Sequence, residues 1–385
     1  MSTRLLVFGG RFDPPHKGHI ESLTSAVDTL NPDRTFVVPS HAAYKHGQGS
    51  TDEERMRLCK LAFEPIPGVT VSDIELSGKS VSDTSSTLCA LREEYPGAEL
   101  FFLVGSDVLP RLIECETFRH VLPLCTLTVS ERSGSDGIAC AEQLTERFGA
   151  KITRIPGQPS AADSTLLRSL LSQRLGREFL SDSVYAEIIR LRLYGAQPEL
   201  LWLREQVDRY LKPTRIPHVR GCEAEAIRMA ERWGVEPDLA AEAGILHDVT
   251  KKLEYSEQLH LCERYGIILD AAEREEPKLL HARTGAYFAR EVFGVSDSVF
   301  SAIEWHTTGR ENMTVLEKIV YLADMIEPSR TFPGVDELRA LAYSDLDAAM
   351  ICGLTMSLSA VESHGAIPHE RTKAALAYFL LKGKI

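Results

Sequence analysis

The sequence predicts a two-domain protein, with an α/β domain built on a parallel sheet over residues 1–195 and an all-α domain over residues 196–385. In the first half, short apolar runs alternate with segments of helical periodicity, which is typical of a parallel sheet with crossover helices. Beyond Gly195, strand-like runs become hard to find. A chain of 385 residues is also longer than one typical hydrophobic core supports.

The composition argues against several classes of function. The formal net charge of −12 argues against nonspecific nucleic-acid binding, which needs a basic face, although local basic residues or metals can still hold small anions. No apolar stretch approaches the roughly 18 residues that span a membrane. The eight cysteines include no C-x-x-C pair, so we expect reduced thiols and a cytoplasmic protein.

The most informative stretch lies near the start of the chain. Residues 5–8 are uniformly apolar, which is typical of a buried strand, and they are followed by two glycines, a Pro-Pro turn and a helix expected over residues 18–30. A strand, a loop and a helix in this order direct backbone N–H groups and a helix N-terminus at a phosphate. His16 and His19 fall near the start of this helix, so both can reach the same anion. The pattern is neither a Walker loop nor the dinucleotide-binding fingerprint.

The remaining elements of the first half keep the same alternation. Thr51 followed by Glu54 predicts a helix that starts with a capping box. Because parallel strands end together at one edge of the sheet, we expect ligands to bind at their C-terminal ends, in a Rossmann-like arrangement. The expected strands cover residues 35–39, 69–76, 100–104 and 124–129, and the expected helices cover residues 51–63 and 84–95.

The first half resembles the nicotinate-nucleotide adenylyltransferase family, part of the nucleotidylyltransferase group with its His-x-Gly-His motif. The signature is matched by Gly9-Gly10-Arg11-Phe12-Asp13-Pro14-Pro15-His16-Lys17-Gly18-His19. Two further segments are similar to the family's Gly-x-Asp and Ser-Ser-Thr-x-x-Arg motifs, namely Gly105-Ser106-Asp107 and Asp163-Ser164-Thr165-Leu166-Leu167-Arg168. The resemblance covers roughly residues 1 to 195.

The resemblance implies adenylyl transfer from ATP to a mononucleotide, with nicotinate mononucleotide as the family's acceptor. The acceptor phosphate attacks the α-phosphorus of ATP in line, pyrophosphate leaves, and Mg²⁺ bridges the phosphate charges. His16 and His19 are assigned to the triphosphate. Ser164, Thr165 and Arg168 converge at the start of a helix, where hydroxyls, N–H groups and a guanidinium can hold phosphates. The other residues implied in binding ATP or the acceptor are Gly9, Gly10, Phe12, Asp13, Lys45, Thr84, Gly105 and Asp107.

The acceptor side departs from the family pattern in three places. The family's Pro-Pro-His-Lys corresponds to residues 42–45, where Lys45 either meets the acceptor phosphate or is a solvated loop lysine. Thr84 is kept, but Asp83 places a charge beside it. The tryptophan that stacks on the nicotinate ring corresponds to Cys115, a loss on the order of 1 kcal/mol or more. Two alternatives therefore stay open: another acceptor, or a domain that binds nucleotide and only regulates the second domain.

The second half carries a different set of reactive residues. After a linker over residues 197–217, a helix opens near Arg215 and runs to about Trp233, and an apolar helical segment ends at His247-Asp248. This half resembles the HD-domain phosphohydrolases and, over about residues 200–383, the YqeK family, whose members cut diadenosine tetraphosphate symmetrically to two ADP. The resemblance is carried by His218, His247-Asp248, Lys251, His281, His306-Thr307-Thr308-Gly309, Asp324-Met325-Ile326-Glu327-Pro328 and Arg330.

These residues predict a dinuclear metal site. Imidazoles and carboxylates favour first-row metals such as iron, manganese or zinc over calcium, and we expect iron. His247 and Asp248 are adjacent and point in different directions, so Asp248 can bridge two ions while His247 serves one. Two ions about 3.5–4 Å apart can bind a phosphoryl oxygen and convert a bridging water into hydroxide. We expect one ion on His218, His247, Asp248 and Asp324, and the second on Asp248, His281 and His306.

Two cations are candidates for the substrate phosphates. Lys251 lies one turn after His247 and can face a phosphate, although a surface helix lysine is the alternative. Arg330 is the second candidate. His260 matches no motif and is expected at the surface, and His364 and His369 lie in a late loop without an assigned role.

The sequence as a whole predicts a fused, bifunctional nucleotide enzyme. We expect ATP, nicotinate mononucleotide and diadenosine tetraphosphate as its small-molecule partners, with no nucleic acid and no membrane, and a homo-oligomer is possible. Other nucleoside polyphosphates or a phosphomonoester stay open as substrates of the second domain, because histidine and aspartate ligands define a metal and a reaction class but not a base.

Overall fold

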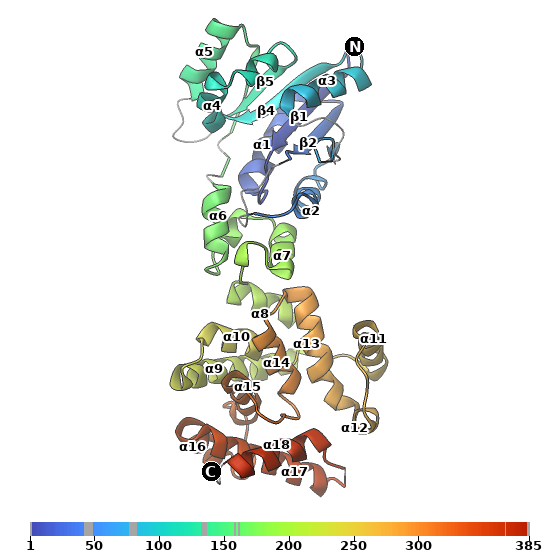
Figure 1. Ribbon diagram of the computed structural model, residues 1–385, viewed down its shortest axis with the longest axis vertical. Helices are drawn as coiled ribbons and strands as arrows, with labels where there is room; N and C mark the ends of the chain where they lie inside the picture. Colours follow the sequence, from blue (N-terminus) through green and yellow to red (C-terminus); the bar gives the residue numbers. More distant parts are fainter. Residues whose placement is uncertain are drawn as a thin grey trace. The chain divides into compact units, whose positions relative to one another are not determined.

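The computed structural model describes residues 2–41, 49–76, 83–131, 137–157, 159–160, 162–365 and 367–382. The chain forms two compact units, Met1–Gln197 and Pro198–Ile385 (Figure 1). Lys45, an expected acceptor-phosphate residue, lies outside the described residues. Each unit is considered by itself below.

The first unit contains the predicted parallel sheet. Within the described residues it has six strands in the order β3-β2-β1-β4-β5-β6, and every neighbouring pair is parallel. The order reverses between β1 and β4, where Phe8 pairs with both Val37 and Leu103. A reversal of this kind opens a crevice at the C-terminal ends of the two strands. The strands are β1 (Arg4–Gly10), β2 (Arg34–Pro39), β3 (Val69–Val71), β4 (Glu99–Gly105), β5 (Thr126–Ser130) and β6 (Ile152–Ile155).

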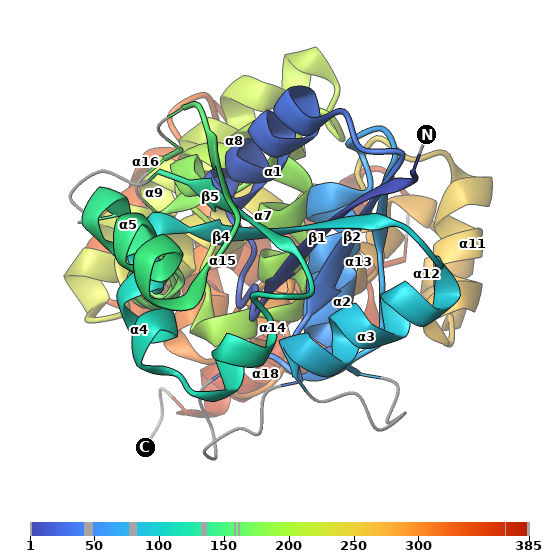
Figure 2. The same ribbon diagram turned by 90° about the horizontal axis from the view of Figure 1, so that it is seen from above.

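The helices of this unit cover both faces of the sheet. Figure 2 shows α1 on one face and α3 and α4 on the other. The expected capping box at the start of α2 is present, because Thr51 Oγ1 accepts from Glu54 N and Glu54 Oε2 accepts from Thr51 N. The helices are α1 (Lys17–Leu30), α2 (Asp52–Phe63), α3 (Thr84–Glu94), α4 (Leu109–Glu114), α5 (Gly137–Phe148), α6 (Ser164–Leu171) and α7 (Asp182–Leu191).

The sequence analysis extended one strand too far and missed another. The strand expected over residues 69–76 ends at Val71, and residues 74–76 form a turn. The strand β6 was not predicted from its four residues, Ile-Thr-Arg-Ile, of which only Ile155 is fully buried. A short edge strand with one buried side chain carries too weak a pattern to be recognised.

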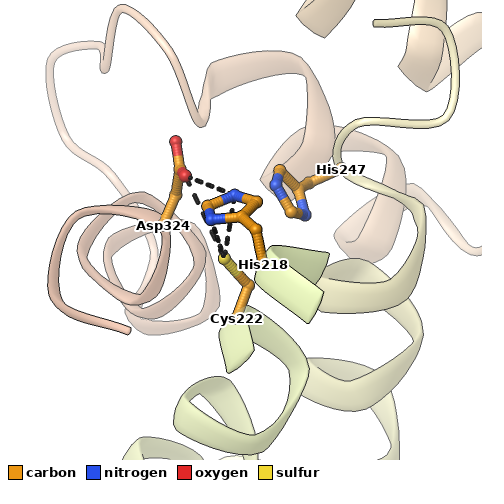
Figure 3. Close-up of side chains that lie close together, drawn as sticks. All are labelled: His218, Cys222, His247 and Asp324. Carbon is orange, nitrogen blue, oxygen red and sulfur yellow. Dashed lines mark hydrogen bonds and ion pairs between the residues drawn. The ribbon is translucent and has the colours of Figure 1, made fainter. Parts of the chain in front are cut away.

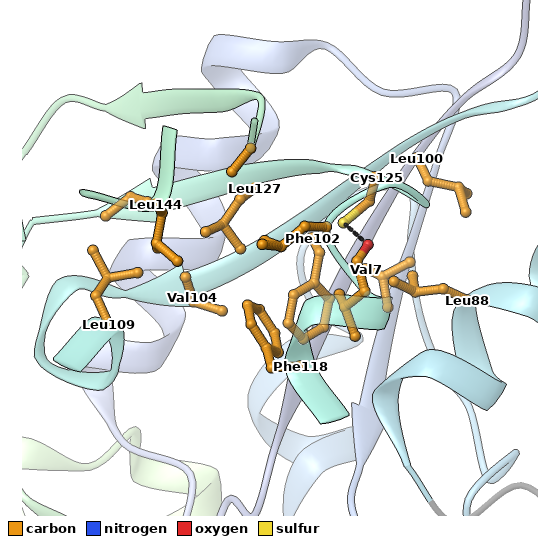
Figure 4. Close-up of a cluster of buried hydrophobic side chains, with 14 of the residues drawn as sticks. Val7, Leu88, Leu100, Phe102, Val104, Leu109, Phe118, Cys125, Leu127 and Leu144 are labelled. Atoms are coloured by element: carbon orange, nitrogen blue, oxygen red, sulfur yellow. Dashed lines mark hydrogen bonds between the residues drawn. The ribbon is translucent and has the colours of Figure 1, made fainter. Parts of the chain in front are cut away.

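The core of the first unit lies between the sheet and α3, α4 and α5. Figure 4 shows Phe102 of β4 and Phe118 among aliphatic side chains of these elements. Phe102 is 5% exposed and Phe118 is 6% exposed, and their ring centroids are 6.5 Å apart. Phe102 pairs with Val7 of β1, so this core packs against the two central strands of the sheet.

The second unit is all-helical over its described residues, as the sequence predicted. The helix expected near residues 215–233 is α9, and α10 ends directly before His247. Helices α9 and α10 approach closely, because a Cβ on Gly244 would lie 2.9 Å from the Glu223 Cα. The helices are α8 (Leu200–Asp208), α9 (Ile216–Trp233), α10 (Pro237–Leu246), α11 (Tyr255–Tyr265), α12 (Ala271–Glu275), α13 (Leu280–Phe293), α14 (Asp297–Trp305), α15 (Val315–Ile326), α16 (Val335–Ser344), α17 (Leu346–Ser363) and α18 (Glu370–Lys382).

A carboxylate links α7 to α2 in the first unit. Glu187 accepts from Arg190 Nε and Nη2, both at 2.8 Å, and pairs with Arg57 of α2. The hydrogen bonds from Arg190 hold the pKa of Glu187 below its usual 4.5, against the opposing effect of burial. A carboxylate whose pKa is lowered by folding stabilises the fold above its unfolded pKa and loses that contribution as the pH falls through its folded pKa.

We predict that Glu187→Gln lowers the free energy of unfolding at pH 7 by about 1 kcal/mol, after allowance for solvent screening. The deficit should shrink as the pH falls below 4.5, because the wild-type carboxylate then takes up its proton. Urea unfolding followed by circular dichroism at several pH values measures both effects. Glu178→Gln, at an exposed glutamate of the same unit, serves as the control. A deficit that stays constant down to pH 3 would contradict the assignment.

Candidate active sites

A cavity of about 520 Å³ lies in the first unit at the C-terminal ends of β1 and β4. It is bounded by the starts of α1, α3 and α6, so several helix N-termini and the glycine-rich loop face it. The sequence-predicted residues that line it are Gly9, Gly10, Phe12, His16, His19, Thr84, Gly105, Asp107 and Ser164.

The two histidines of the His-x-Gly-His motif stack on each other at this cavity. Their ring centroids are 3.6 Å apart, and His16 N donates to His19 Nδ1 at 3.2 Å. Gly18 between them is required by packing, because a Cβ there would lie 2.5 Å from the Ser160 carbonyl oxygen. The loop that leads to α6 can therefore close over the start of α1 only if residue 18 is glycine.

Three predicted ATP residues do not line the cavity. Asp13 is 1% exposed, and its Oδ1 accepts from the Tyr194 hydroxyl at 2.7 Å and from Ser50 N at 3.2 Å. Arg168 Nη1 donates to the Asp13 carbonyl at 2.6 Å, and its Nη2 donates to Thr165 Oγ1 at 3.4 Å. Asp13, Thr165 and Arg168 thus hold the loop that carries His16. The sequence analysis did not single out Tyr194, a tyrosine near the end of the unit.

The acceptor side of the cavity differs from the expectation. Asp83 is exposed and caps α3 by accepting from Ser86 N at 2.9 Å, and Cys115 packs at the margin of the core. Neither residue lines the cavity, whereas Phe118 and Arg111 do. The aromatic ring of Phe118 therefore lies at this cavity, three residues after Cys115, the position at which the family resemblance places the stacking tryptophan.

A buried carboxyl also faces this cavity and was missed from the sequence. Glu75 is 9% exposed and accepts from Thr87 Oγ1 at 2.8 Å. Burial raises its pKa. It follows the strand β3 in a turn, and no motif marks it.

The second site is centred on Asp248, whose side chain is fully buried. Its Oδ2 faces His218 Nε2 at 3.9 Å and His247 Nε2 at 3.4 Å. Its Oδ1 faces His281 Nε2 at 3.2 Å and His306 Nε2 at 3.8 Å. Each carboxylate oxygen thus faces a different pair of imidazoles.

Helix ends bring these side chains together from distant parts of the unit. His218 lies in α9, His281 in the first turn of α13, and His306 directly after α14. Asp324 of α15 lies 3.0 Å from His218 Nε2 through its Oδ1 (Figure 3). Figure 3 also shows Cys222 of α9 beside His218, a neighbour that the sequence analysis did not single out.

All four imidazoles present Nε2 to Asp248 because each Nδ1 is engaged behind it. A hydrogen bond on the far nitrogen sets the ring orientation and the tautomer of a metal-binding histidine. Gly221 makes room for one of these partners, because a Cβ there would lie 2.6 Å from Glu327 Oε2. The Nδ1 partners are Glu327 Oε1 for His218 at 3.0 Å, Gly244 O for His247 at 2.7 Å, Lys278 O for His281 at 2.5 Å, and Ile303 O for His306 at 2.7 Å.

The electrostatics suit a cation on the His281 and His306 side of Asp248, whereas on the other side a metal ion has to displace a proton, because the pKa of His218 is raised to about 9 by its hydrogen bond to Asp324, against the effect of burial. Burial lowers the pKa of His281 to about 4 and lowers the pKa of His306, so both rings are neutral and available as ligands at pH 7. Burial opposes the charge on Asp248, but His247 and the neighbouring rings hold its pKa well below the usual range. His247 Nε2 and Asp248 Oδ1 are buried without a hydrogen bond from the described residues. Buried polar atoms in this condition fit a metal ion.

Three side-chain cations lie against these carboxylates. Arg215 donates to Asp248 Oδ2 at 2.6 Å, Arg330 donates to Asp324 Oδ1 at 2.6 Å, and Lys251 Nζ lies 3.4 Å from Asp248 Oδ1. Lys251 and Arg330 were expected here, whereas Arg215 was missed. Its only sequence signal is that it lies three residues before His218, one helical turn away.

A second cavity, of about 740 Å³, adjoins this site. Thr307 and Thr308 line it, and Thr307 Oγ1 is 3.3 Å from His306 Nε2. The unassigned His364 and His369 line its other side, and His369 Nε2 pairs with Asp270 at 3.0 Å. Apolar residues complete the wall.

Comparisons with known proteins divide the chain in the same two parts. Residues 7–170 match the cytidylyltransferase-like family, and residues 215–329 match the HD domain family. A probable nicotinate-nucleotide adenylyltransferase/Ap4A hydrolase of Mycoplasma pneumoniae is 27% identical over 352 residues, covering 89% of this chain and 96% of the relative.

Two relatives match one half each. A symmetrical bis(5'-nucleosyl)-tetraphosphatase of Halalkalibacterium halodurans is 37% identical over 179 residues, covering 46% of this chain and 95% of the relative. A probable nicotinate-nucleotide adenylyltransferase of Clostridium novyi is 31% identical over 179 residues, covering 45% of this chain and 90% of the relative. Among the described residues, no helix is both long and apolar enough to cross a membrane.

We predict that Asp248→Asn reduces the metal content of the purified protein at least tenfold, because it removes the anionic donor that faces both histidine pairs. Inductively coupled plasma mass spectrometry measures this directly. Asp336→Asn, at a side chain that is 92% exposed, should leave the content unchanged. A full metal complement in the Asp248 variant would remove Asp248 from the ligand set.

Proposed function

Because the first half of this chain belongs to the nicotinate-nucleotide adenylyltransferase family and the second half to the symmetrical bis(5'-nucleosyl)-tetraphosphatase family, we propose that the protein is a bifunctional nucleotide enzyme. The first unit transfers the adenylyl group of ATP to nicotinate mononucleotide. The second unit hydrolyses diadenosine tetraphosphate to two ADP. The observation that carries the proposal is the arrangement at Asp248. Each of its two carboxylate oxygens faces a separate pair of imidazoles.

Adenylyl transfer needs positioning and charge neutralisation rather than a protein nucleophile. A phosphate oxygen of the acceptor forms a bond to the α-phosphorus of ATP, and the bond from that phosphorus to the β-phosphate bridge breaks, releasing pyrophosphate. The stacked His16 and His19 at the start of α1 stabilise the negative charge that develops on the leaving pyrophosphate, helped by the helix N-terminus. Mg²⁺ bound to the nucleotide would neutralise phosphate charge. Asp13 and Arg168 act indirectly by holding the loop of His16.

The acceptor pocket supports nicotinate mononucleotide through Phe118, Arg111 and Thr84, which line the same cavity as the ATP residues. The Phe118 ring offers an apolar face for a pyridine ring, and the guanidinium of Arg111 offers a partner for a carboxylate or phosphate. Glu75 favours a second candidate, nicotinamide mononucleotide, because a carboxyl in the cavity disfavours an anionic pyridine and can pair with a neutral amide.

We predict pyrophosphate release from ATP, Mg²⁺ and nicotinate mononucleotide by the full-length protein, at a higher kcat/KM than with nicotinamide mononucleotide. His19→Ala should reduce kcat roughly 100-fold, because it removes one charge-stabilising contact to the triphosphate. His260→Ala, at an exposed histidine of the other unit, should have no effect. A preference for nicotinamide mononucleotide would select the second candidate. No pyrophosphate release with either acceptor would contradict both candidates and mean that the first unit has another acceptor or only binds nucleotide.

In the second unit, the proposed reaction adds water across the central phosphoanhydride of diadenosine tetraphosphate and yields two ADP. A metal pair, for which we propose iron, would be held by His218, His247, Asp248, Asp324, His281 and His306 and would supply hydroxide at neutral pH. The chain's own contribution is to orient the four imidazoles through their Nδ1 hydrogen bonds. Lys251, Arg215 and Arg330 supply positive charge for the phosphates around the scissile bond.

The cavity beside His306 supports a nucleoside polyphosphate rather than a small phosphomonoester. Its volume of about 740 Å³ lies in the range of pockets that enclose a drug-sized ligand. Leu358, Val361 and Ile367 give it an apolar wall suited to a base, and Thr307 joins it to the metal-binding side chains. A substrate that consists of a phosphate group alone would leave this wall in water.

We predict that diadenosine tetraphosphate yields ADP as the only nucleotide product, and that Ile367→Asp raises its KM roughly tenfold with little change in kcat, because a charge replaces apolar wall at the base. Ion-exchange chromatography of the products and initial rates provide the readouts. Ile268→Asp is a matched control, because Ile268 is 85% exposed and Ile367 is 74% exposed. Formation of ATP and AMP would contradict symmetrical cleavage, and an unchanged KM would remove the cavity from substrate binding.

We also propose that both reactions take place in the cytoplasm. All eight cysteines are free thiols in the structure, which suits a reducing compartment.

A further inference from the structure

Cys222 occupies an unexpected place among the buried thiols of this chain. It lies on α9 one turn after His218 and is 2% exposed. Its Sγ is 3.4 Å from His218 Nε2 and 4.0 Å from Asp324 Oδ1 (Figure 3). The sulfur therefore faces the same small space as two donors of the proposed metal site.

The spacing of these atoms fits donors on a single ion. Donor atoms of His218, Cys222, His247 and Asp324 all lie within 4.8 Å of one another. Bonds of about 2.1 Å to nitrogen and oxygen and about 2.3 Å to sulfur place neighbouring donors roughly 3 to 4 Å apart. The distances from the sulfur to the imidazole and to the carboxylate fall in this interval.

His247 provides an independent observation. Its side chain is fully buried, and its Nε2 forms no hydrogen bond to any of the described residues. Its Nδ1 is 2.7 Å from the Gly244 carbonyl oxygen, and its Nε2 faces the space beside His218 and Cys222. A buried ring nitrogen without a hydrogen-bond partner fits a metal ion that displaces any proton it carries.

Other buried cysteines show what a purely structural thiol looks like here. Cys125 packs in the core of the first unit and donates to the Val121 carbonyl, and Cys262 packs in a small apolar cluster of the second unit. Burial raises the pKa of both thiols. Cys222 differs because its sulfur contacts an imidazole and a carboxylate instead of an apolar wall.

We propose that Cys222 is a thiolate ligand of the metal ion on the His218 side of Asp248, an inference that rests on the proposed hydrolase function. On binding, the thiol gives its proton to solvent and a sulfur–metal bond forms, so one negative charge is added to the site. Soft thiolate donors favour zinc, cobalt and ferrous iron over magnesium or manganese. The described residues offer no sulfur beside His281 and His306, so the two halves of the site differ in metal preference.

The test is to add Co²⁺ to the metal-free, full-length protein. Cobalt bound by a thiolate shows intense charge-transfer absorption in the near ultraviolet in addition to its visible bands. We expect both absorptions in the wild type. Cys222→Ser and Cys222→Val should keep the visible bands and lose the near-ultraviolet absorption. Cys262→Ser, at a cysteine that is 3% exposed in the same unit, should keep both.

Two further measurements strengthen this test. In competition, Cys222→Val should shift the ratio of bound Zn²⁺ to bound Mn²⁺ at least tenfold toward Mn²⁺. X-ray absorption of the zinc-loaded wild type needs no variant and should show sulfur scattering at about 2.3 Å. Scattering from nitrogen and oxygen alone, or charge-transfer absorption that survives in Cys222→Val, overturns the assignment. Either result leaves ADP formation by the wild type intact, so it is distinguishable from failure of the hydrolase proposal.

Discussion

The burial of the Asp248 carboxylate is the constraint on which the second unit is built. An ionised carboxylate removed from water is costly unless cations and hydrogen-bond donors replace the water. Here two pairs of imidazoles approach its two oxygens, and Arg215 donates to one of them. The positive charge beside Asp248 can come from side chains or from bound metal. The close packing of α9 on α10 at Gly244 places the ring of His218 next to the Asp248 carboxylate.

The first unit has to attract an anionic substrate, and it does so largely with backbone N–H groups. The whole protein carries a net charge of −12, yet the proposed substrates ATP and diadenosine tetraphosphate are both polyanions, so attraction must be local. The glycine loop and the starts of α1 and α6 supply N–H groups at one edge of the sheet. Buried Asp13, held by Tyr194 and Ser50, fixes the loop from beneath. A carboxylate thus serves as an anchor here and as a proposed ligand at Asp248.

The sequence was informative where chemistry requires unusual residue types at fixed spacing. His247-Asp248 and the His16-x-x-His19 pair stand out for that reason, and the alternation of strands and helices predicted the parallel sheet. It was uninformative where common residue types act through tertiary placement. Arg215, directly before α9, and Cys222, on α9, lie about one turn before and after His218, but a single arginine or cysteine at such a position carries no signal of its own. Phe118 lines the first cavity and Cys115 does not, because the chain turns between α4 and β5. A sequence motif does not reveal a turn of that kind.

Chemistry and recognition are separated in the second unit. The donors around Asp248 come from α9 and α15 and from the ends of α10, α13 and α14. These donors can recognise only the phosphate groups and the charge of a substrate. The neighbouring cavity is lined largely by η6 (Pro277–Leu279), by α17 and by residues 364, 365 and 367–369, which contribute apolar surface and two histidines. Substitutions in this second set can change which nucleoside is accepted without disturbing the donors. Under the proposed function, the base specificity depends on the packing of α17 and of the residues that follow it, whereas the reaction class depends on the buried carboxylate.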